Sequence, residues 1–237
     1  MIIDTHCHYD MMDYPEDYID KMEKTGNIVI GMTNLPSHFD MGFEHVRKYN
    51  RVRLALGFHP QLAEENKNEL SLFAKNLGRT SYVGEIGLDF SSDYISTKDS
   101  QISCLKYILE KLHGKDKIIS VHSRCAEKEL FSLLLEYNIR NVIFHWYSGP
   151  LSLISDIISK GYYFSINEAM TLSSSGRKII ERIPLERILT ESDAPFNRKN
   201  NIASALRNLN LKESLIERNF RQLIQQIKRD NYINKAR

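Results

Sequence analysis

The chain has 237 residues, of which 42% are hydrophobic and 26% charged, so it can bury a core without disulfides or a structural metal. No apolar run approaches the ~20 residues of a membrane span, and the N-terminus lacks the basic and apolar segments of a secretion signal. We therefore expect a cytoplasmic protein that makes no membrane contact. The three cysteines, Cys7, Cys104 and Cys125, are odd in number and irregularly spaced, which indicates reduced thiols.

The formal net charge is only +2, but it is unevenly distributed. Residues 197–237 hold ten Lys and Arg against three Asp and Glu. Such a segment predicts either contact with a polyanion or the solvated face of a terminal helix.

Apolar and β-branched runs alternate with amphipathic segments along most of the chain. The predicted strands lie within residues 1–4, 27–34, 52–60, 81–89, 117–123, 141–149, 162–167 and 187–195. The helix-like segments between them include residues 15–26, 71–78, 99–114, 127–138 and 151–161. About eight units of each kind predict an α/β fold, a (β/α)8 TIM barrel, with a doubly wound sheet as the alternative.

The pattern changes after Pro195 to a polar loop and then a last amphipathic helix. Apolar residues recur at helical spacing over residues 211–227, so we expect this C-terminal helix to pack on the barrel. No linker interrupts the chain, and we expect a single domain over residues 1–237.

Good metal ligands stand near the ends of five predicted strands. His6 and His8 would project to one side of the first strand, since side chains alternate along a strand. Alone, this pair is weak evidence, but the C-terminal ends of barrel strands are where such enzymes build their active sites. The residues expected to converge there are His6, His8, Glu85, His122, His145 and Asp193.

Six such groups at one mouth would have to shift their pKa values or be neutralised, so cations are the economical explanation. The alternative is a set of satisfied core histidines with unrelated carboxylates. Imidazole and carboxylate without thiolate favour Zn, Mn, Mg, Co or Ni in a hydrolytic site. The number of groups predicts two divalent metal ions about 3.5 to 4 Å apart, an arrangement used for displacement at phosphorus.

The motifs "DTHCH", "GFHP", "VGEIGLDF", "VHSR", "HWYSG" and "TESDAP" occur in this order. From about Met1 to Pro195 the chain thereby resembles the TatD-like metal-dependent deoxyribonucleases of the amidohydrolase superfamily. The resemblance implies a distorted (β/α)8 barrel that holds two divalent ions. It also implies hydrolysis of phosphodiester bonds in nucleic acid, typically as a 3′ to 5′ exonuclease on DNA.

The resemblance also implies roles for matching residues. His6 and His8 would bind the first ion, while His122 and His145 would bind the second. Glu85 would bridge the two ions. Asp193 would bind the first ion and accept a proton from the attacking water. His59, in "GFHP", would contact the substrate phosphate, or alternatively orient its loop.

Some relatives bridge their metals with a carboxylated lysine on the fourth strand. Here the fourth strand carries Glu85, and Lys117 begins the next strand at the wrong end, so the expected bridge is Glu85. Arg124 follows His122 in a strand-to-helix turn, where it would contact an anion together with helix N-terminal amides or pair with Glu127. Trp146 and Tyr147 would stack on a base or simply pack.

The chain departs from the family pattern at two places that concern substrate. Gln61 stands where many relatives have a second histidine after "HP". The loop after Pro195 lacks the relatives' proline- and arginine-bearing sequence, which affects substrate size and end preference, with Arg198 and Lys199 as candidate replacements. Short chains of this kind resemble the TatD-like components of prokaryotic anti-phage operons, such as the Qat type, which implies protein partners in a defence operon.

Two other functions stay open from the sequence. The same site could hydrolyse an ester or amide, for example as a D-aminoacyl-tRNA deacylase. The chain could also be a metal-containing subunit of a larger defence assembly.

Overall fold

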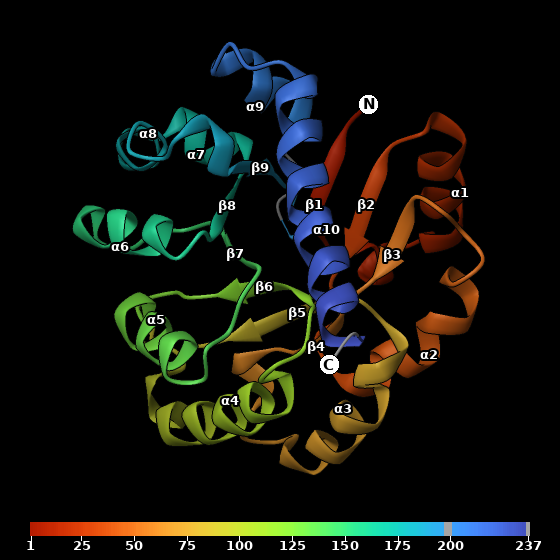
Figure 1. Ribbon diagram of the computed structural model, residues 1–237, viewed down its shortest axis with the longest axis vertical. Helices are drawn as coiled ribbons and strands as arrows, with labels where there is room; N and C mark the ends of the chain where they lie inside the picture. Colours follow the sequence, from red (N-terminus) through yellow and green to blue (C-terminus); the bar gives the residue numbers. More distant parts are fainter. Residues whose placement is uncertain (197–200, 236–237) are drawn as a thin grey trace.

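The computed structural model describes residues 1–196 and 201–235, and the side chains of residues 228–235 are not described. Parallel strands form two sheets at the centre of the molecule (Figure 1). In the first sheet β1 pairs with β2 and β2 with β3; in the second, β4 to β9 pair in chain order. The strands are β1 (Ile3–Cys7), β2 (Ile28–Gly31), β3 (Val52–Leu54), β4 (Leu56–Phe58), β5 (Tyr82–Gly87), β6 (Ile118–His122), β7 (Val142–His145), β8 (Tyr163–Ile166) and β9 (Ile188–Thr190).

The two sheets together form one barrel, as predicted. β3 and β4 occupy one barrel position, interrupted only at Ala55. Thr33, just after β2, bonds both to Ala55 O through its hydroxyl (2.9 Å) and to Gly84 O through its N–H (3.3 Å), which joins the sheets on this side. On the other side the Thr5 hydroxyl donates to Thr190 O at 3.0 Å, which links β1 to β9.

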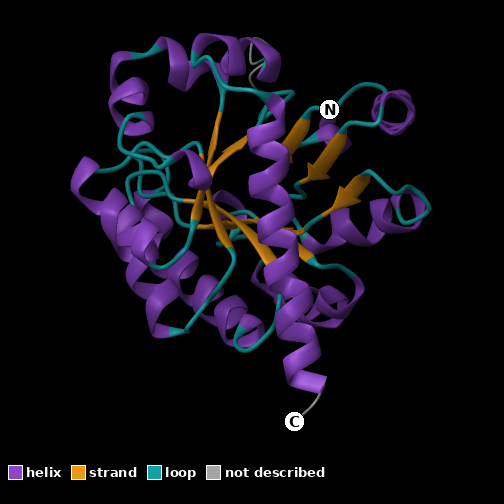
Figure 2. Ribbon diagram, turned by 45° about the horizontal axis from the view of Figure 1, so that its top comes forward, coloured by secondary structure: helices purple, strands orange, loops and turns teal. Residues whose placement is uncertain are grey.

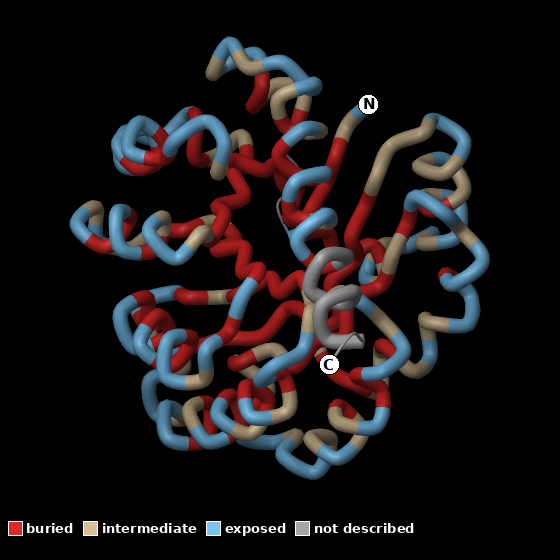
Figure 3. The backbone as a smooth tube through the Cα atoms, viewed as in Figure 1, coloured by how far each residue is buried: buried red, intermediate tan, exposed pale blue. Residues whose placement is uncertain are grey.

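Helices surround the strands, and Figure 2 shows them around the central strands. They are α1 (Pro15–Thr25), α2 (Pro36–Val46), α3 (Leu70–Asn76), α4 (Lys98–Leu112), α5 (Glu127–Glu136), α6 (Ile154–Ser159), α7 (Glu168–Leu172), α8 (Ser174–Ile180), α9 (Ile202–Asn208) and α10 (Glu213–Lys235). Figure 3 shows why the strands read as continuous apolar runs: they are buried, while the outer surfaces of the helices are exposed. Among the described helices, none is long and apolar enough to cross a membrane.

The last helix, α10, packs on the barrel as predicted. Phe220, Leu223 and Ile227 are buried, and the Asn219 amide donates to the carbonyls of Leu185 and Ile188 near the start of β9. The helix therefore lies against the end of the barrel where strands begin. Arg218 and Arg221 of this helix are exposed, which agrees with a solvated face; contact with a polyanion stays a prediction.

Local structure differs from the expectation in several places. Strand β9 ends at Thr190, so Asp193 follows the strand by three residues instead of closing it. Strand β5 runs two residues beyond Glu85. Helices α2, α7, α8 and α9 have short or mixed apolar patterns and were not among the predicted segments. The basic residues Arg198 and Lys199 lie outside the described residues.

Candidate metal centre

A bulge in β5 places Glu85 in the barrel interior. Between Val83 and Ile86 the register of β5 shifts relative to both β4 and β6, so that one extra residue stands on β5. Such a bulge re-aims a side chain locally. Gly84 has φ +151°, and a Cβ there would meet Met32 Sδ at 2.7 Å, so the position requires glycine. The adjoining Gly84–Glu85 peptide bond is cis.

The carboxylate of Glu85 lies among the ring nitrogens of five histidines. Its Oε2 is 3.4 Å from His6 Nε2, 3.3 Å from His8 Nε2 and 3.5 Å from His59 Nε2. Its Oε1 is 2.6 Å from His122 Nδ1 and 3.4 Å from His145 Nε2. One carboxylate thus faces two different groups of imidazoles through its two oxygens.

Asp193 completes the group on the His6 side. Its Oδ1 is 3.8 Å from the Nε2 atoms of both His6 and His8, which are themselves 3.2 Å apart. The N–H of Asp193 donates to His6 O at 3.0 Å, so the loop after β9 is tied to β1. The structure therefore brings together all six residues that the sequence predicted would converge.

Three of the histidines are oriented through their second ring nitrogen. His6 Nδ1 bonds to Ser120 Oγ at 2.8 Å, His122 Nε2 faces Asp89 Oδ2 at 3.0 Å, and His145 Nδ1 faces Glu191 Oε2 at 3.2 Å. Partners of this kind fix the orientation and tautomer of a metal-binding imidazole. His8 Nδ1 has no hydrogen-bond partner among the described residues.

Glu191 and Asp89 were not among the predicted site residues. Glu191 is fully buried and also accepts from Asn167 Nδ2 at 2.9 Å and from the Ser165 hydroxyl. The motifs "GLDF" and "TESD" contain both residues, and a search for carboxylates next to predicted ligands would have found them. The sequence does not show which histidine each carboxylate contacts.

The ionisable groups of the centre shift one another's pKa values. Burial opposes charge on Glu85, yet His59, His145 and His6 hold the pKa of its carboxyl well below the usual range. Burial and His145 lower the pKa of His6 well below its usual value. Burial also opposes charge on His145, but the carboxylates of Glu191 and Glu85 raise its pKa well above the usual value.

Asp193 behaves differently from Glu85. Burial raises the pKa of Asp193 to about 6; Glu191 and Glu85 add to this rise, while His145 opposes it. Its carboxyl can therefore exchange a proton near neutral pH.

The donor set fits divalent cations. Ligand atoms lie within 4.8 Å of one another in three groups: His6 with His8 and Asp193, His6 with Glu85 and His145, and His59 with Glu85 and His122. Imidazole nitrogens and carboxylate oxygens are the ligands of hydrolytic zinc, manganese and related sites. The ring nitrogens that face the centre have mainly one another and Glu85 as neighbours. A bound cation would offset the cost of burying these polar groups together.

The other predicted residues have varied positions. His59 is half-buried; its Nδ1 accepts from Gln61 N–H at 3.3 Å, so it both caps its own turn and faces Glu85. Lys117 Nζ donates to Thr80 O at the opposite end of β6 from His122, in agreement with the expectation that it cannot bridge the centre.

Arg124 and the two aromatic residues lie near the ends of β6 and β7. Arg124 is exposed, and within the part of the chain that the structure describes its guanidinium makes no ion pair with Glu127. Tyr147 is 1% exposed and its hydroxyl donates to a backbone carbonyl at 2.8 Å, so of its two predicted roles, stacking on a base or packing, it has the packing role. Trp146 is half-buried and stands edge-on to His145, with 6.5 Å between ring centroids.

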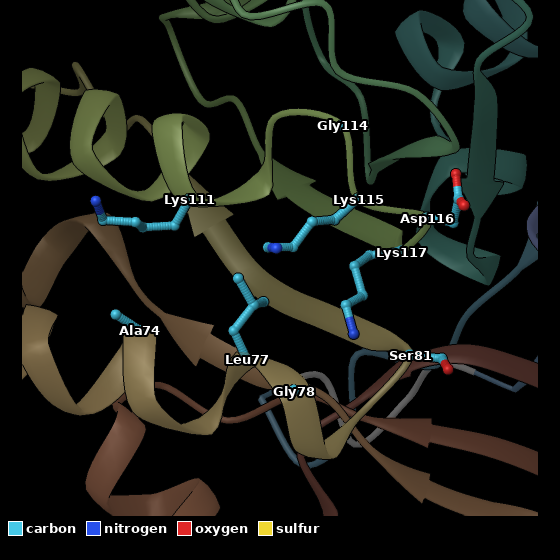
Figure 4. A pocket seen from close by; sticks show the side chains of 9 residues that line it. All are labelled: Ala74, Leu77, Gly78, Ser81, Lys111, Gly114, Lys115, Asp116 and Lys117. Carbon is cyan, nitrogen blue, oxygen red and sulfur yellow. The ribbon is translucent and has the colours of Figure 1, made fainter. Parts of the chain in front are cut away.

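A hollow of about 590 Å³ lies elsewhere on the molecule (Figure 4). Its lining includes Lys115, Lys117 and Ser81, which precede β6 and β5. These residues are at the strand ends remote from Glu85 and His122, so the hollow does not belong to the metal centre. The candidate metal centre is therefore recognised by its histidine and carboxylate side chains and not by the volume of a hollow.

The comparisons with known proteins agree with this geometry. The sequence model of the family described as "TatD related DNase" matches residues 3–232. The chain belongs to this family. It is 28% identical over 213 residues to the "Putative deoxyribonuclease TATDN3" of Mus musculus, covering 82% of this chain and 72% of the mouse protein. It is also 28% identical over 210 residues to the "Uncharacterized metal-dependent hydrolase YjjV" of Escherichia coli, covering 81% and 79%.

Solved structures of TatD homologues share the fold. The crystal structure of Escherichia coli YjjV superposes with a TM-score of 0.75 at 23% identity, covering 98% of this chain and 96% of that one. A TatD-family hydrolase of Entamoeba histolytica gives a TM-score of 0.65 at 17% identity, covering 97% and 96%. The predicted (β/α)8 barrel and TatD-like membership are thereby confirmed.

Proposed function

We propose that this TatD-family hydrolase cleaves phosphodiester bonds in DNA as a 3′ to 5′ exonuclease, with two divalent cations at the Glu85 centre. The observation that supports this most is the two-sided carboxylate of Glu85, with His6 and His8 near one oxygen and His122 and His145 near the other. A single cation would need only one of these sets.

The proposed ligands divide into two sets. His6, His8 and Asp193 would hold one cation, His122 and His145 the other, and Glu85 would lie between them. When bound, the cations would supply Lewis-acid polarisation of the phosphate and acidify a water molecule. The identity of the ions, among Mg, Mn, Zn, Co and Ni, stays a prediction.

The chain's own residues would then manage protons and substrate charge. Asp193, whose pKa is raised to about 6, would accept the proton of the attacking water. His59 Nδ1 accepts from a backbone N–H, which leaves its proton on Nε2, where it would donate to a phosphate oxygen. Arg124, exposed beyond β6, would add an anion contact.

The test uses protein stripped of metal and reloaded with individual divalent ions. Single- and double-stranded DNA and RNA, labelled at either end, are incubated with each form. We expect mononucleotides released from the 3′ end of DNA, at a rate that falls with salt because phosphate contacts release counterions. Asp193→Asn should abolish release, and Asp156→Asn, a matched change at an exposed residue of α6, should not.

The proposed nuclease activity would be contradicted by a metal-loaded protein that releases nucleotides from none of these substrates. Release of amino acid from charged tRNA under the same conditions would then assign the centre to ester hydrolysis. The predicted anti-phage role, the protein partners in a defence operon, the cytoplasmic location and the single domain over residues 1–237 stay predictions.

A further inference from the structure

Gln61 is connected to the metal centre through a buried carboxylate. It lies three residues after β4 ends, within the turn Pro60–Leu62, and is half-buried. Its side-chain Nε2 donates to Asp89 Oδ2 at 2.8 Å. The same oxygen faces His122 Nε2 at 3.0 Å, so Gln61 and His122 share one carboxylate oxygen.

Asp89 is fixed on its other sides as well. Its Oδ1 accepts from the N–H of Ser91 at 3.0 Å and from the Ser91 hydroxyl at 2.5 Å. Its backbone N–H and C=O both bond to the side chain of Gln101, each at 2.8 Å. Because Asp89 is fully buried, its carboxylate depends on Ser91, Gln61 and His122 as donors in place of water. Gln61 is the donor that connects the Asp89 carboxylate to the turn after β4.

The position of Asp89 determines which nitrogen of His122 faces the centre. A carboxylate accepts only, so Nε2 carries a proton that it donates to Asp89 Oδ2. Nδ1 likewise donates a proton to Glu85 Oε1 at 2.6 Å. A cation would take the place of the proton on Nδ1, and the bond to Asp89 would keep the other proton on Nε2 and hold the Nδ1 lone pair toward the cation. Rotation of the Asp89 carboxylate would release Nε2 and with it the orientation of the ring.

We propose that Gln61 is a positioning residue for the cation held between Glu85, His122 and His145. It acts through Asp89 and touches no reacting atom. This inference rests on the proposed two-cation site, and it predicts that loss of the Gln61 amide weakens one cation and leaves the other, between His6, His8 and Asp193, unchanged.

The test is a calorimetric titration of the stripped protein with Mn²⁺ or Zn²⁺. In Gln61→Leu we expect one of two equivalents to bind about 10- to 100-fold more weakly, the usual cost of losing such a partner. Gln61→His, which restores an N–H donor at this place, should recover most of the affinity. Gln225→Leu, on an exposed position of α10, is the matched control and should bind like the wild type.

A second readout separates orientation from general damage. In the stripped protein, ¹⁵N chemical shifts should report a protonated Nε2 at His122 in the wild type and a changed environment at this nitrogen in Gln61→Leu. If Gln61→Leu does not fold, Gln61→Asn shortens the side chain, keeps its polarity and takes its place in both measurements.

The outcomes are distinct. Unchanged binding of both equivalents in a folded variant, equal weakening of both, or failure of Gln61→His to restore binding would each overturn the inference. None of these results bears on whether the wild type cleaves DNA. Wild-type protein that binds no second cation would instead contradict the proposed function itself.

Discussion

Replacement of Glu85 by glutamine removes the feature on which both proposed cations depend. Glu85 is 2% exposed, and its two oxygens lie within 3.5 Å of the ring nitrogens of five histidines. An amide has nearly the same shape, but it is uncharged and one of its ends is an NH₂ donor without a lone pair for a cation. Glu85→Gln therefore tests the carboxylate and leaves the packing in place.

The expected loss of activity follows from the stabilisation that the cations would give the transition state. If loss of the shared ligand removes about 4 kcal/mol of transition-state stabilisation, kcat/KM falls about 10³-fold, since each 1.36 kcal/mol is a factor of ten. The number of tightly bound cations should fall from two to at most one.

The assay combines metal analysis after dialysis with nucleotide release from end-labelled DNA. Glu136→Gln makes the same change at an exposed residue of α5 and should behave as the wild type. Circular dichroism and urea unfolding establish that both variants are folded. A folded Glu85→Gln protein that keeps two cations and more than a tenth of the activity would show that Glu85 is not the shared ligand.

Three further predictions concern the partners of the metal centre and the packing of α10. Glu191→Gln removes the carboxylate that faces His145 Nδ1 and should weaken binding of one cation about 10- to 100-fold in a titration; unchanged affinity would show that Glu191 does not position the imidazole. Cation affinity of the stripped protein should rise from pH 5 to pH 7. Burial raises the pKa of Asp193 to about 6, and Glu191 and Glu85 raise the pKa of His145 well above its usual value against the effect of burial, so a cation must displace protons from both groups at low pH. Calorimetry at pH 5 and pH 7 checks this, and equal affinities would contradict it. Leu223→Ala empties a fully buried position of α10 and should lower the free energy of unfolding by about 2 to 5 kcal/mol in urea, whereas a loss below 1 kcal/mol would mean that the helix does not depend on this contact.

The convergence of the six predicted residues could be read from the sequence because it depends on strand polarity. Parallel strands of a barrel end at one rim, so His6, His122 and His145, each at or near the end of an apolar run, had to meet once the alternation of strands and helices was recognised. The same rule of strand polarity places Lys117 at the end of its strand that is remote from the metal centre.

Other features depend on tertiary contacts that no local pattern shows. Asp89 and His122 are 33 residues apart, and Glu191 and His145 are 46 apart, so their pairing follows from how the strands of the barrel lie in space. The bulge that turns Glu85 inward depends on register with both neighbouring strands.

Burial of Tyr147 was also not predictable. "HWYSG" leaves the strand at Trp146, where φ is +37°, and this turn sends the two aromatic side chains into different surroundings. The sequence leaves stacking and packing open for both, and only the structure shows that Tyr147 is in the core.

The proposed function requires that the carboxylate of Glu85 lie between two cations. This can be examined in a crystal structure of the protein reloaded with Mn²⁺, with anomalous scattering recorded. We expect two peaks about 3.5 to 4 Å apart, one on each side of Glu85. A single peak, or a second peak that is remote from Glu85, would contradict it.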